Sequence, residues 1–272
     1  MSREEGRASA EQSPDGSRAT AYTQSFTTPW LALSRALGEQ TLAYISWGRG
    51  VETEVVPNRS RYTNRGQALP ALESRQLEGG VKHADADVDW SVTAFDIRRP
   101  LAQDFCAGPD ATVCTRTIDG AQRHRGLEAS WQRRTGAWST KLSALWLHAE
   151  RVGAMDAADN GLRPVNVPAS SLRAEVGHDL SVVPGLTLLA YLTTEGNREV
   201  LPDNSITIPA WTRVDLAARY RGALGPYPAL WQAGVDNATG QRAWREAPYQ
   251  FGHVYLFPMA PRTWRASVQV MF

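Results

Sequence analysis

The sequence predicts an all-β protein, an antiparallel up-and-down transmembrane β-barrel wall of about eleven strands. Segments of about ten residues recur along the chain, and in most of them apolar and polar side chains alternate. The gaps between these segments are alternately short and long, as tight turns at one edge of a barrel and long loops at the other require. The chain also contains ten Trp, eight Tyr and six Phe, enough for aromatic girdles at the two membrane surfaces.

The last segment, Arg262–Phe272, shows the alternation most clearly, with Trp264, Val268 and Val270 on one face and polar side chains on the other. Asp89–Arg98 and Leu186–Glu195 alternate poorly but have the expected length. The other expected strands are Trp30–Ala36, Thr41–Trp47, Arg75–His83, Gly126–Arg134, Thr140–His148, Ser171–Leu180, Trp211–Tyr220 and Ala229–Asn237.

The gaps set the expected orientation, because short turns of outer-membrane barrels face the periplasm and long loops face outside. This places the C-terminus on the periplasmic side. The short gaps are Leu37–Gln40, Ala84–Val88, Thr135–Trp138, Ser181–Gly185 and Arg221–Pro228. The long gaps are Gly48–Ser74, Arg99–Arg125, Ala149–Ser170, Gly196–Ala210 and Ala238–Pro261.

Other protein classes remain as alternatives at this point. Alternation by itself also fits a soluble β-rich binding domain, and an outer-membrane enzyme or a porin-like barrel shares the strand pattern. The sequence has no GxSxG, HExxH or phosphate loop, so we expect no enzyme. It has no apolar run long enough for a membrane helix. Its net charge of +1 gives no reason to expect a nucleic-acid partner.

Five short segments lie in order at the expected strand positions. They are Leu69–Lys82, His124–Glu128, Ile208–Leu216, Gly234–Asn237 and the approach to the last strand, Ala260–Trp264. Together they resemble the C-terminal β-barrel portion of TonB-dependent siderophore receptors. The resemblance extends from about residue 27 to the end, although Ala238 and Thr239 stand where the family usually has Leu-Phe.

This resemblance implies a transporter that binds ferric siderophores at the surface of a bacterial outer membrane and is driven by the TonB complex. Such barrels have about 22 strands around a plug, so residues 27–272 are expected to form half of one, after a polar segment, 1–26, expected to be loop or disordered. We see no plug, no TonB-contact segment and no secretory signal, and therefore expect a truncated gene product or half of a split gene that does not transport alone. No cofactor is implied.

The resemblance also assigns a role to the chain end. An aromatic last residue with apolar residues at alternate positions before it resembles the signal read by the barrel-assembly machinery. In this sequence those residues are Trp264, Val268, Val270 and Phe272. The apolar face of such a strand is expected to contact outer-membrane lipid.

Cys106 and Cys114 are the only cysteines, and both fall in one expected long loop. If that loop faces the oxidising exterior, the two are expected to form a disulfide. The alternative is a pair of free thiols in a cytosolic protein. Metal binding is not expected there, because no His or further Cys lies near them in sequence.

Arginine and aromatic side chains in the long gaps are candidate ligands for anionic, partly aromatic chelates: Arg61, Tyr62, Arg65, Trp244, Arg245, Tyr249 and Tyr255, with Phe251 and Phe257 beside them. Packing among loops or an outer aromatic girdle is the simpler role, and we expect it for most of them. On the polar face, Arg173, Arg213, Arg219 and Arg265 either guide an anion or pair with acids, and we expect pairing with Glu175 and Asp215. The five His are scattered, and no metal site is expected.

One measurement separates the membrane interpretation from the soluble one. A transmembrane wall exposes apolar residues to lipid, so the chain expressed without detergent is expected to aggregate. A monodisperse soluble monomer would contradict the membrane interpretation.

Overall fold

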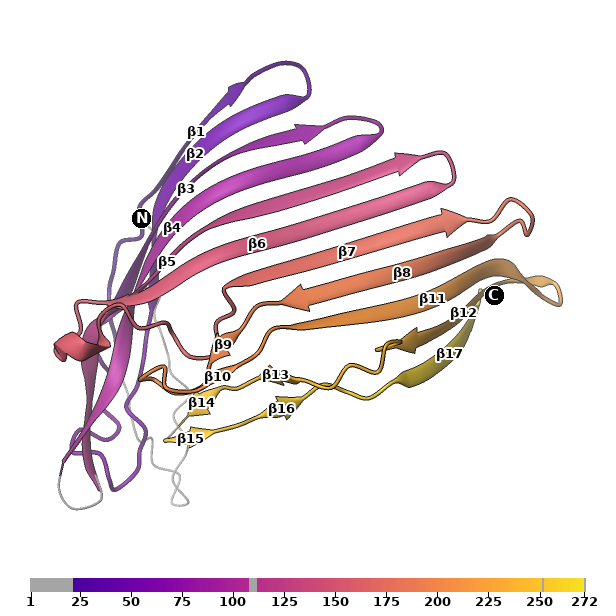
Figure 1. The fold of residues 1–272 in the computed structure, drawn as a ribbon. Helices are drawn as coiled ribbons and strands as arrows, with labels where there is room; N and C mark the ends of the chain where they lie inside the picture. The colour runs from indigo at the N-terminus through magenta and orange to yellow at the C-terminus, as the bar shows by residue number, and fades with distance from the viewer. Residues whose placement is uncertain (1–21, 108–111, 251, 272) are drawn as a thin grey trace.

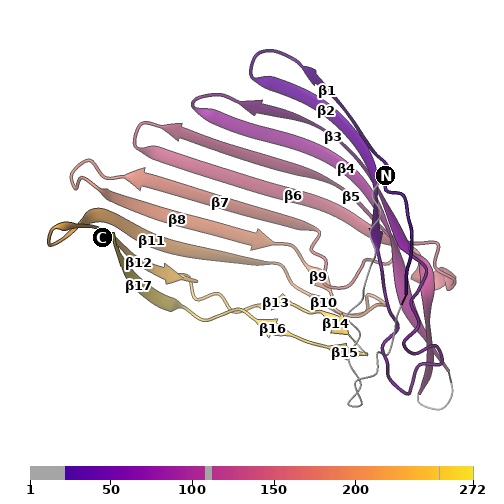
Figure 2. The ribbon, with the colours of Figure 1, turned by 180° about the vertical axis from the view of Figure 1, so that it is seen from behind.

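The computed structural model describes residues 22–107, 112–250 and 252–271 as one curved antiparallel sheet with loops folded over one edge (Figure 1). The sheet has 11 strands in the order β1-β2-β3-β4-β5-β6-β7-β8-β11-β12-β17, and the reverse view shows the same succession (Figure 2). The expected all-β, up-and-down architecture and all eleven expected strands are confirmed. The strands are β1 (Trp30–Ala36), β2 (Thr41–Glu52), β3 (Leu72–Ala84), β4 (Val88–Ala107), β5 (Val113–Thr135), β6 (Trp138–Val152), β7 (Ser170–Asp179), β8 (Leu186–Glu195), β11 (Trp211–Leu224), β12 (Tyr227–Asp236) and β17 (Thr263–Val270).

The remaining regular elements are short and lie in the long loops. A 3₁₀ helix spans Ala157–Asp159. Three two-stranded sheets pair β9 (Arg198–Glu199) with β10 (Thr207–Ile208), β13 (Trp244–Glu246) with β16 (Phe257–Pro258), and β14 (Tyr249–Gln250) with β15 (His253–Val254). Within the described ranges, no helix is long and apolar enough to cross a membrane.

The five short connections lie at one edge of the sheet. Three of them hold glycines with positive φ, Gly136 at φ 55°, Gly185 at φ 90° and Gly225 at φ 61°, where a side chain would be strained. In the β3–β4 turn, the Asp85 carboxylate accepts the backbone N–H groups of Val88 at 2.7 Å and Asp87 at 2.8 Å. These bonds, with one from His83, lower the pKa of Asp85 to about 2. The aspartate therefore stays ionised and fixes the turn.

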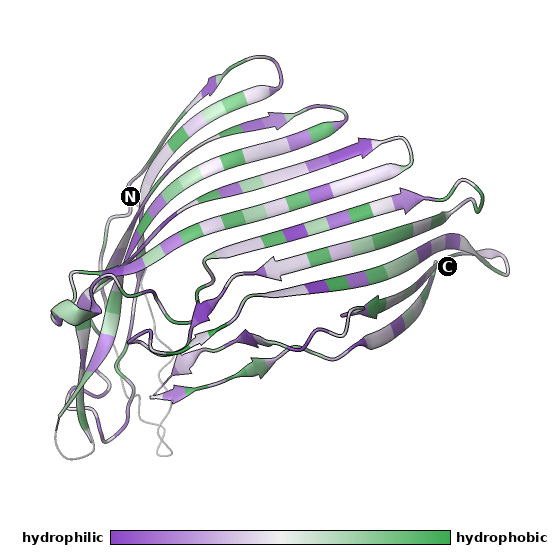
Figure 3. Ribbon diagram, in the orientation of Figure 1, coloured by the Kyte–Doolittle hydropathy of each residue, from purple (hydrophilic) through white to green (hydrophobic). Residues whose placement is uncertain are grey.

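The register of the strands aligns apolar side chains into one face that runs across the sheet. Leu142, Ala174, Leu192 and Val214 lie in a row across β6, β7, β8 and β11. Because successive residues of a strand point to opposite faces, this row and its neighbours form one continuous side. Figure 3 shows the resulting alternation of hydrophobic and hydrophilic positions along the strands.

The opposite face consists of polar side chains, which the same register aligns across the strands. Lys141, Glu175, Tyr191 and Asp215 are the neighbouring row across the same four strands. A hollow of about 530 Å³ on this side is lined partly by Lys141, Arg173, Glu175 and Tyr191. The sheet thus has one apolar and one polar face, as a wall between lipid and a wet interior requires.

The apolar face is not sealed into a core. Trp264 is 77% exposed, Val268 45% and Leu172 38%, and Val214 is only half buried. A soluble sandwich would bury these side chains together. Their exposure on one continuous face agrees with contact to lipid.

Aromatic side chains gather on the apolar face close to the short turns. Trp90 stacks on His83 with ring centroids 5.7 Å apart, and Trp138 lies 4.1 Å from the ring of His178. Trp131 and Tyr220 occupy the corresponding level of β5 and β11. This is the position of an interfacial girdle.

The prediction that Arg99–Arg125 forms a loop is wrong. β4 runs for 20 residues and β5 for 23, and they remain paired from Val88↔Arg133 to Ala107↔Val113, interrupted by a register shift between Pro100 and Ala102. Beyond the bilayer neither face must be apolar, so the alternation disappears while the backbone pairing continues. For the same reason β2 and β6 extend further than the sequence suggested.

The sheet does not close. β1 and β17 stand at its two edges, each paired with one described strand only. Of the expected polar segment 1–26, residues 1–21 lie outside the described part of the chain, and residues 22–26 have no regular secondary structure. Gln24 donates from Nε2 to the carbonyl of Leu69 at 2.8 Å, which brings this segment to the long-loop edge.

Two neighbouring positions on β6 test the assignment of the faces. Ala144 belongs to the apolar face between Trp138 and Trp146, and Ser143 faces the other way. Ala144→Arg is expected to lower the unfolding free energy by about 2 kcal/mol in urea titrations in phospholipid vesicles, because arginine meets hydrocarbon there. Ser143→Arg, the matched control, should change it by less than about 1 kcal/mol. Equal losses would contradict the assignment.

Candidate functional site

A layer of loops covers the long-loop edge, and its first part is built on the outer ends of β4 and β5. The loop between β2 and β3 folds down so that Val56, Tyr62, Leu69 and Cys114 form a small buried cluster. Cys106 and Cys114 are joined in a disulfide across the paired strands. The cluster packs the β2–β3 loop against the disulfide-linked ends of β4 and β5.

Polar contacts complete this first part. The Tyr62 hydroxyl donates to Asp104 at 2.6 Å, and Arg116 bridges Asp104 at 2.7 Å and Glu54 at 2.6 Å. Arg61 lies 3.5 Å from Asp104. The aspartate is therefore the centre that ties the β2–β3 loop to the β4–β5 extension.

The second part contains the loops that follow β6, β8 and β12. Val200, Ile208 and Ala247 form its buried cluster. Asn166, at φ 61°, accepts the Ala247 N–H at 2.8 Å and the Arg198 guanidinium at 3.3 Å. These contacts join three loops that are far apart in sequence.

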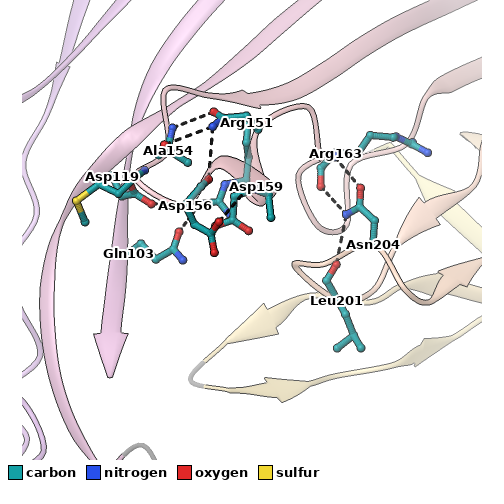
Figure 4. A network of polar contacts seen from close by, with 12 residues as sticks. Gln103, Asp119, Arg151, Ala154, Asp156, Asp159, Arg163, Leu201 and Asn204 are labelled. Atoms are coloured by element: carbon teal, nitrogen blue, oxygen red, sulfur yellow. Dashed lines mark hydrogen bonds and ion pairs between the residues drawn. The ribbon is translucent and has the colours of Figure 1, made fainter. Parts of the chain in front are cut away.

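Arg163 and Asn204 form another link within the second part (Figure 4). The side chain of Asn204 accepts the Arg163 N–H at 2.7 Å and donates to the Arg163 carbonyl at 3.0 Å. The Arg163 guanidinium pairs with Glu199 at 3.0 Å. The loop after β8 thus holds both the backbone and the side chain of Arg163.

Arg151, at the end of β6, joins the second part to the β4–β5 extension (Figure 4). Its side chain is 7% exposed and contacts Asp159 at 2.9 Å, Asp119 at 3.4 Å and Gln103 at 2.5 Å. Asp119, 1% exposed, also accepts the Met155 N–H at 2.8 Å. A buried cation matched by two carboxylates makes the loop layer one connected unit.

The candidate ligand-binding residues fall on two different loops. Arg61, Tyr62 and Arg65 belong to the β2–β3 loop, where Tyr62 is 2% exposed and its hydroxyl is already used. The others belong to the loop between β12 and β17, and each is exposed: Trp244, Arg245, Tyr249, Tyr255 and Phe257. Phe251 lies outside the described residues. The exposed aromatic and basic side chains of the second loop form the more accessible surface.

The arginines of the polar face follow the expected pairing only in part. Arg213 pairs with Asp215 at 2.9 Å, as expected. The expectation for Glu175 is wrong, because its partner is Lys141 at 3.6 Å, directly opposite on β6. Arg265 pairs with Asp236 at 3.1 Å, since the β12–β17 register brings them close. A cross-strand partner depends on register, which the sequence did not reveal.

The anchoring residues Asp104, Arg116, Asp119, Arg151 and Arg163 were not found from the sequence. They lie in segments without alternation, and nothing in their spacing distinguishes them from solvated charges. Their burial arises only when the loops fold together. Among the described residues, no group of three or more His, Cys, Asp or Glu is placed to hold a metal ion.

Comparison with known proteins assigns the family. The family model described as TonB dependent receptor-like, beta-barrel matches residues 6–238. The chain belongs to this family. Its members are bacterial outer-membrane receptors and transporters rather than enzymes.

Individual relatives agree with this assignment. The chain is 28% identical over 227 residues to the ferrichrome receptor FcuA of Yersinia enterocolitica, which covers 83% of this chain. Its structure resembles BauA, the ferric preacinetobactin receptor from Acinetobacter baumannii, with a TM-score of 0.75, 25% identity and 91% of this chain covered. It also resembles the ferric yersiniabactin uptake receptor FyuA from Yersinia pestis, with a TM-score of 0.72, 16% identity and 89% covered.

The chain spans about a third of the length of these relatives, namely 29%, 36% and 37%. Eleven strands are half of the roughly 22 in outer-membrane transporters of this kind. The described sheet therefore corresponds to part of a barrel wall.

Arg151→Met tests the connection between the loops. The substitution leaves Asp119 buried without its cation and should lower the unfolding free energy by about 3 kcal/mol, with faster proteolysis in residues 153–169. The double variant Arg151→Met/Asp119→Asn should recover most of the loss. Lys141→Met, which removes an exposed ion pair, should cost less than about 1 kcal/mol. Similar effects of Arg151→Met and Lys141→Met would exclude the anchoring role.

Proposed function

We propose that this chain forms half of the barrel wall of a TonB-dependent receptor that imports ferric siderophores. The single observation that carries the proposal is the membership of residues 6–238 in the receptor barrel family. Two of the relatives are named as ferrichrome and ferric preacinetobactin receptors, which supports an iron chelate as the ligand. The chelate is transported cargo, and no resident cofactor is proposed.

The proposed contact surface is the exposed part of the β12–β17 loop, with Trp244, Arg245, Tyr249 and Tyr255, together with Arg65 of the β2–β3 loop. Arginine provides paired donors for carboxylate and hydroxamate oxygens, and aromatic rings provide flat apolar contact. Tyr62 has a supporting role in this proposal, because its ring lies 5.1 Å from the Arg61 guanidinium and orients it.

In the proposed orientation the short turns and the C-terminus face the periplasm and the loop layer faces outside. Trp264, Val268 and Val270 lie on the apolar face of β17, where assembly machinery and lipid would meet them. Phe272, the other residue of the expected assembly signal, is outside the described residues. Energy coupling through the TonB complex belongs to other parts of such a receptor.

The two sheet edges need partners in a membrane, since each unpaired backbone group in hydrocarbon costs several kcal/mol. We propose that β1 and β17 pair with further strands that complete the barrel. A plug inside that barrel would meet the polar face, where the hollow lined by Arg173 and Glu175 lies.

Binding of iron-55-labelled ferrichrome and ferric preacinetobactin to outer-membrane preparations tests the proposed ligand surface. Arg245→Gln is expected to weaken binding of the recognised chelate about tenfold or more, because a charge-assisted hydrogen bond is lost. Arg134→Gln makes the same charge change at the short-turn edge and should have no effect. If both variants bind the chelate as the wild-type protein does, the β12–β17 loop is not part of the ligand site. If the wild-type protein binds neither ferrichrome nor ferric preacinetobactin, the proposal that it transports these two chelates is contradicted.

A further inference from the structure

The side chain of one asparagine closes the base of the β12–β17 loop. The β12–β17 ladder ends at the pair Asp236↔Thr263, and Asn237 is the next residue of the chain. Its Nδ2 group donates to the Gln241 carbonyl at 2.9 Å on the outgoing segment and to the Ala260 carbonyl at 3.0 Å on the returning segment. Its Oδ1 atom accepts the Gln241 N–H at 2.8 Å. The amide therefore joins the two segments just beyond the end of the barrel strands.

The proposed ligand residues of this loop stand on a ladder that begins directly beyond the asparagine. The Met259 N–H donates to the Ala243 carbonyl at 2.8 Å, and the β13–β16 pairing follows, with Trp244 opposite Pro258. Figure 1 shows β13 and β16 continuing the line of β12 and β17 toward the long-loop edge. A short two-stranded ladder is marginally stable by itself, so the direction of this one depends on what holds its base.

Two features of position 237 favour asparagine. Asn237 has φ 52°, in the left-handed region that asparagine tolerates better than most residues. It is also only 2% exposed, so protein groups must satisfy the donors and the acceptor of its amide. Glycine would adopt the same backbone conformation but would lose all three side-chain hydrogen bonds.

Asp215 connects this asparagine to the barrel wall. The buried Asp215 carboxylate accepts the Asn237 N–H at 2.7 Å and pairs with Arg213 at 2.9 Å. The Ala238 N–H donates to the Val214 carbonyl of the same strand, β11, at 2.7 Å. The base of the loop is thus closed on itself and also fixed to β11.

A second contact holds the loop farther out. The Asn166 side chain accepts the Ala247 N–H at 2.8 Å, and Ala247 belongs to the outgoing half of the loop. Asn237, by contrast, contacts both halves, so it determines how the outgoing and returning segments lie relative to each other.

We propose that Asn237 is a positioning residue for the proposed ligand surface and holds Trp244 and Arg245 in a fixed orientation relative to the barrel wall. This inference rests on the proposed function, because it requires the β12–β17 loop to contact the chelate. A loop that samples several orientations binds more weakly, in proportion to the fraction of time it spends in the competent one. Closing the loop before the ligand arrives also lowers the ordering cost of binding.

Asn204 provides a matched control within the loop layer. It has φ 57°, and its side chain also makes three hydrogen bonds. Oδ1 accepts the Arg163 N–H at 2.7 Å, and Nδ2 donates to the carbonyls of Arg163 at 3.0 Å and Leu201 at 3.4 Å. These bonds hold the loops after β6 and β8, which do not carry the proposed ligand residues. Asn204→Gly and Asn237→Gly therefore remove comparable contacts from different loops.

The experiment compares these two variants with the wild-type protein, using the full chain. Binding of iron-55-labelled ferrichrome and ferric preacinetobactin is measured in outer-membrane preparations, and hydrogen exchange is measured on the detergent-extracted protein without ligand. Asn237→Gly is expected to weaken binding of the recognised chelate about tenfold and to speed exchange of the amides in residues 241–250. Asn204→Gly should weaken binding by less than about twofold and leave exchange in residues 241–250 unchanged.

Asn237→Asp is a second variant, which keeps the size of the side chain and its acceptor but cannot donate to the two carbonyls. It should also speed exchange in residues 241–250 and weaken binding.

Equal losses of affinity in Asn237→Gly and Asn204→Gly would assign the effect to general loosening of the loops and overturn the positioning role. Unchanged exchange in residues 241–250 of both Asn237 variants would overturn it as well. If the wild-type protein binds neither chelate, the proposed function fails, and the exchange comparison by itself decides whether Asn237 closes the loop.

Discussion

Backbone pairing between adjacent strands across the eleven-stranded antiparallel sheet is the constraint on which the rest of this structure depends. Hydrocarbon offers no hydrogen-bond partner, so a spanning strand must satisfy its N–H and C=O groups through its neighbours. That pairing fixes the register, and the register fixes which side chains share a face. One face becomes apolar and the other polar in the part of the sheet next to the short turns, as the rows through Leu142 and Lys141 show.

The constraint weakens where the strands leave the lipid. β4 and β5 continue as a paired ribbon to the disulfide between Cys106 and Cys114, but neither of their faces stays uniformly apolar. The loops there acquire order in the manner of a small soluble domain, through two buried clusters and the buried cation of Arg151. The molecule therefore combines a barrel wall with a lipid-facing apolar surface and a loop layer that packs like a water-exposed domain.

Charged residues have different partners in these regions. In the loop layer and on the polar face, arginines pair mostly with carboxylates of the protein, as Arg116 does with Asp104 and Arg213 with Asp215. On the lipid side, Arg75 and Arg98 face each other. Other arginines on that side pair with acids of the protein, as Arg125 does with Glu150.

The sequence by itself determined the strands, their order and the two faces, because a period of two residues and the rhythm of the gaps follow directly from spanning a membrane. It also identified the family through segments such as Ile208–Leu216. Only the tertiary structure decided which residues meet: Lys141 with Glu175, Tyr62 with its buried cluster, and Arg75 with Arg98. Register and loop packing bring together residues that are distant in the chain, and no local pattern records which ones will meet.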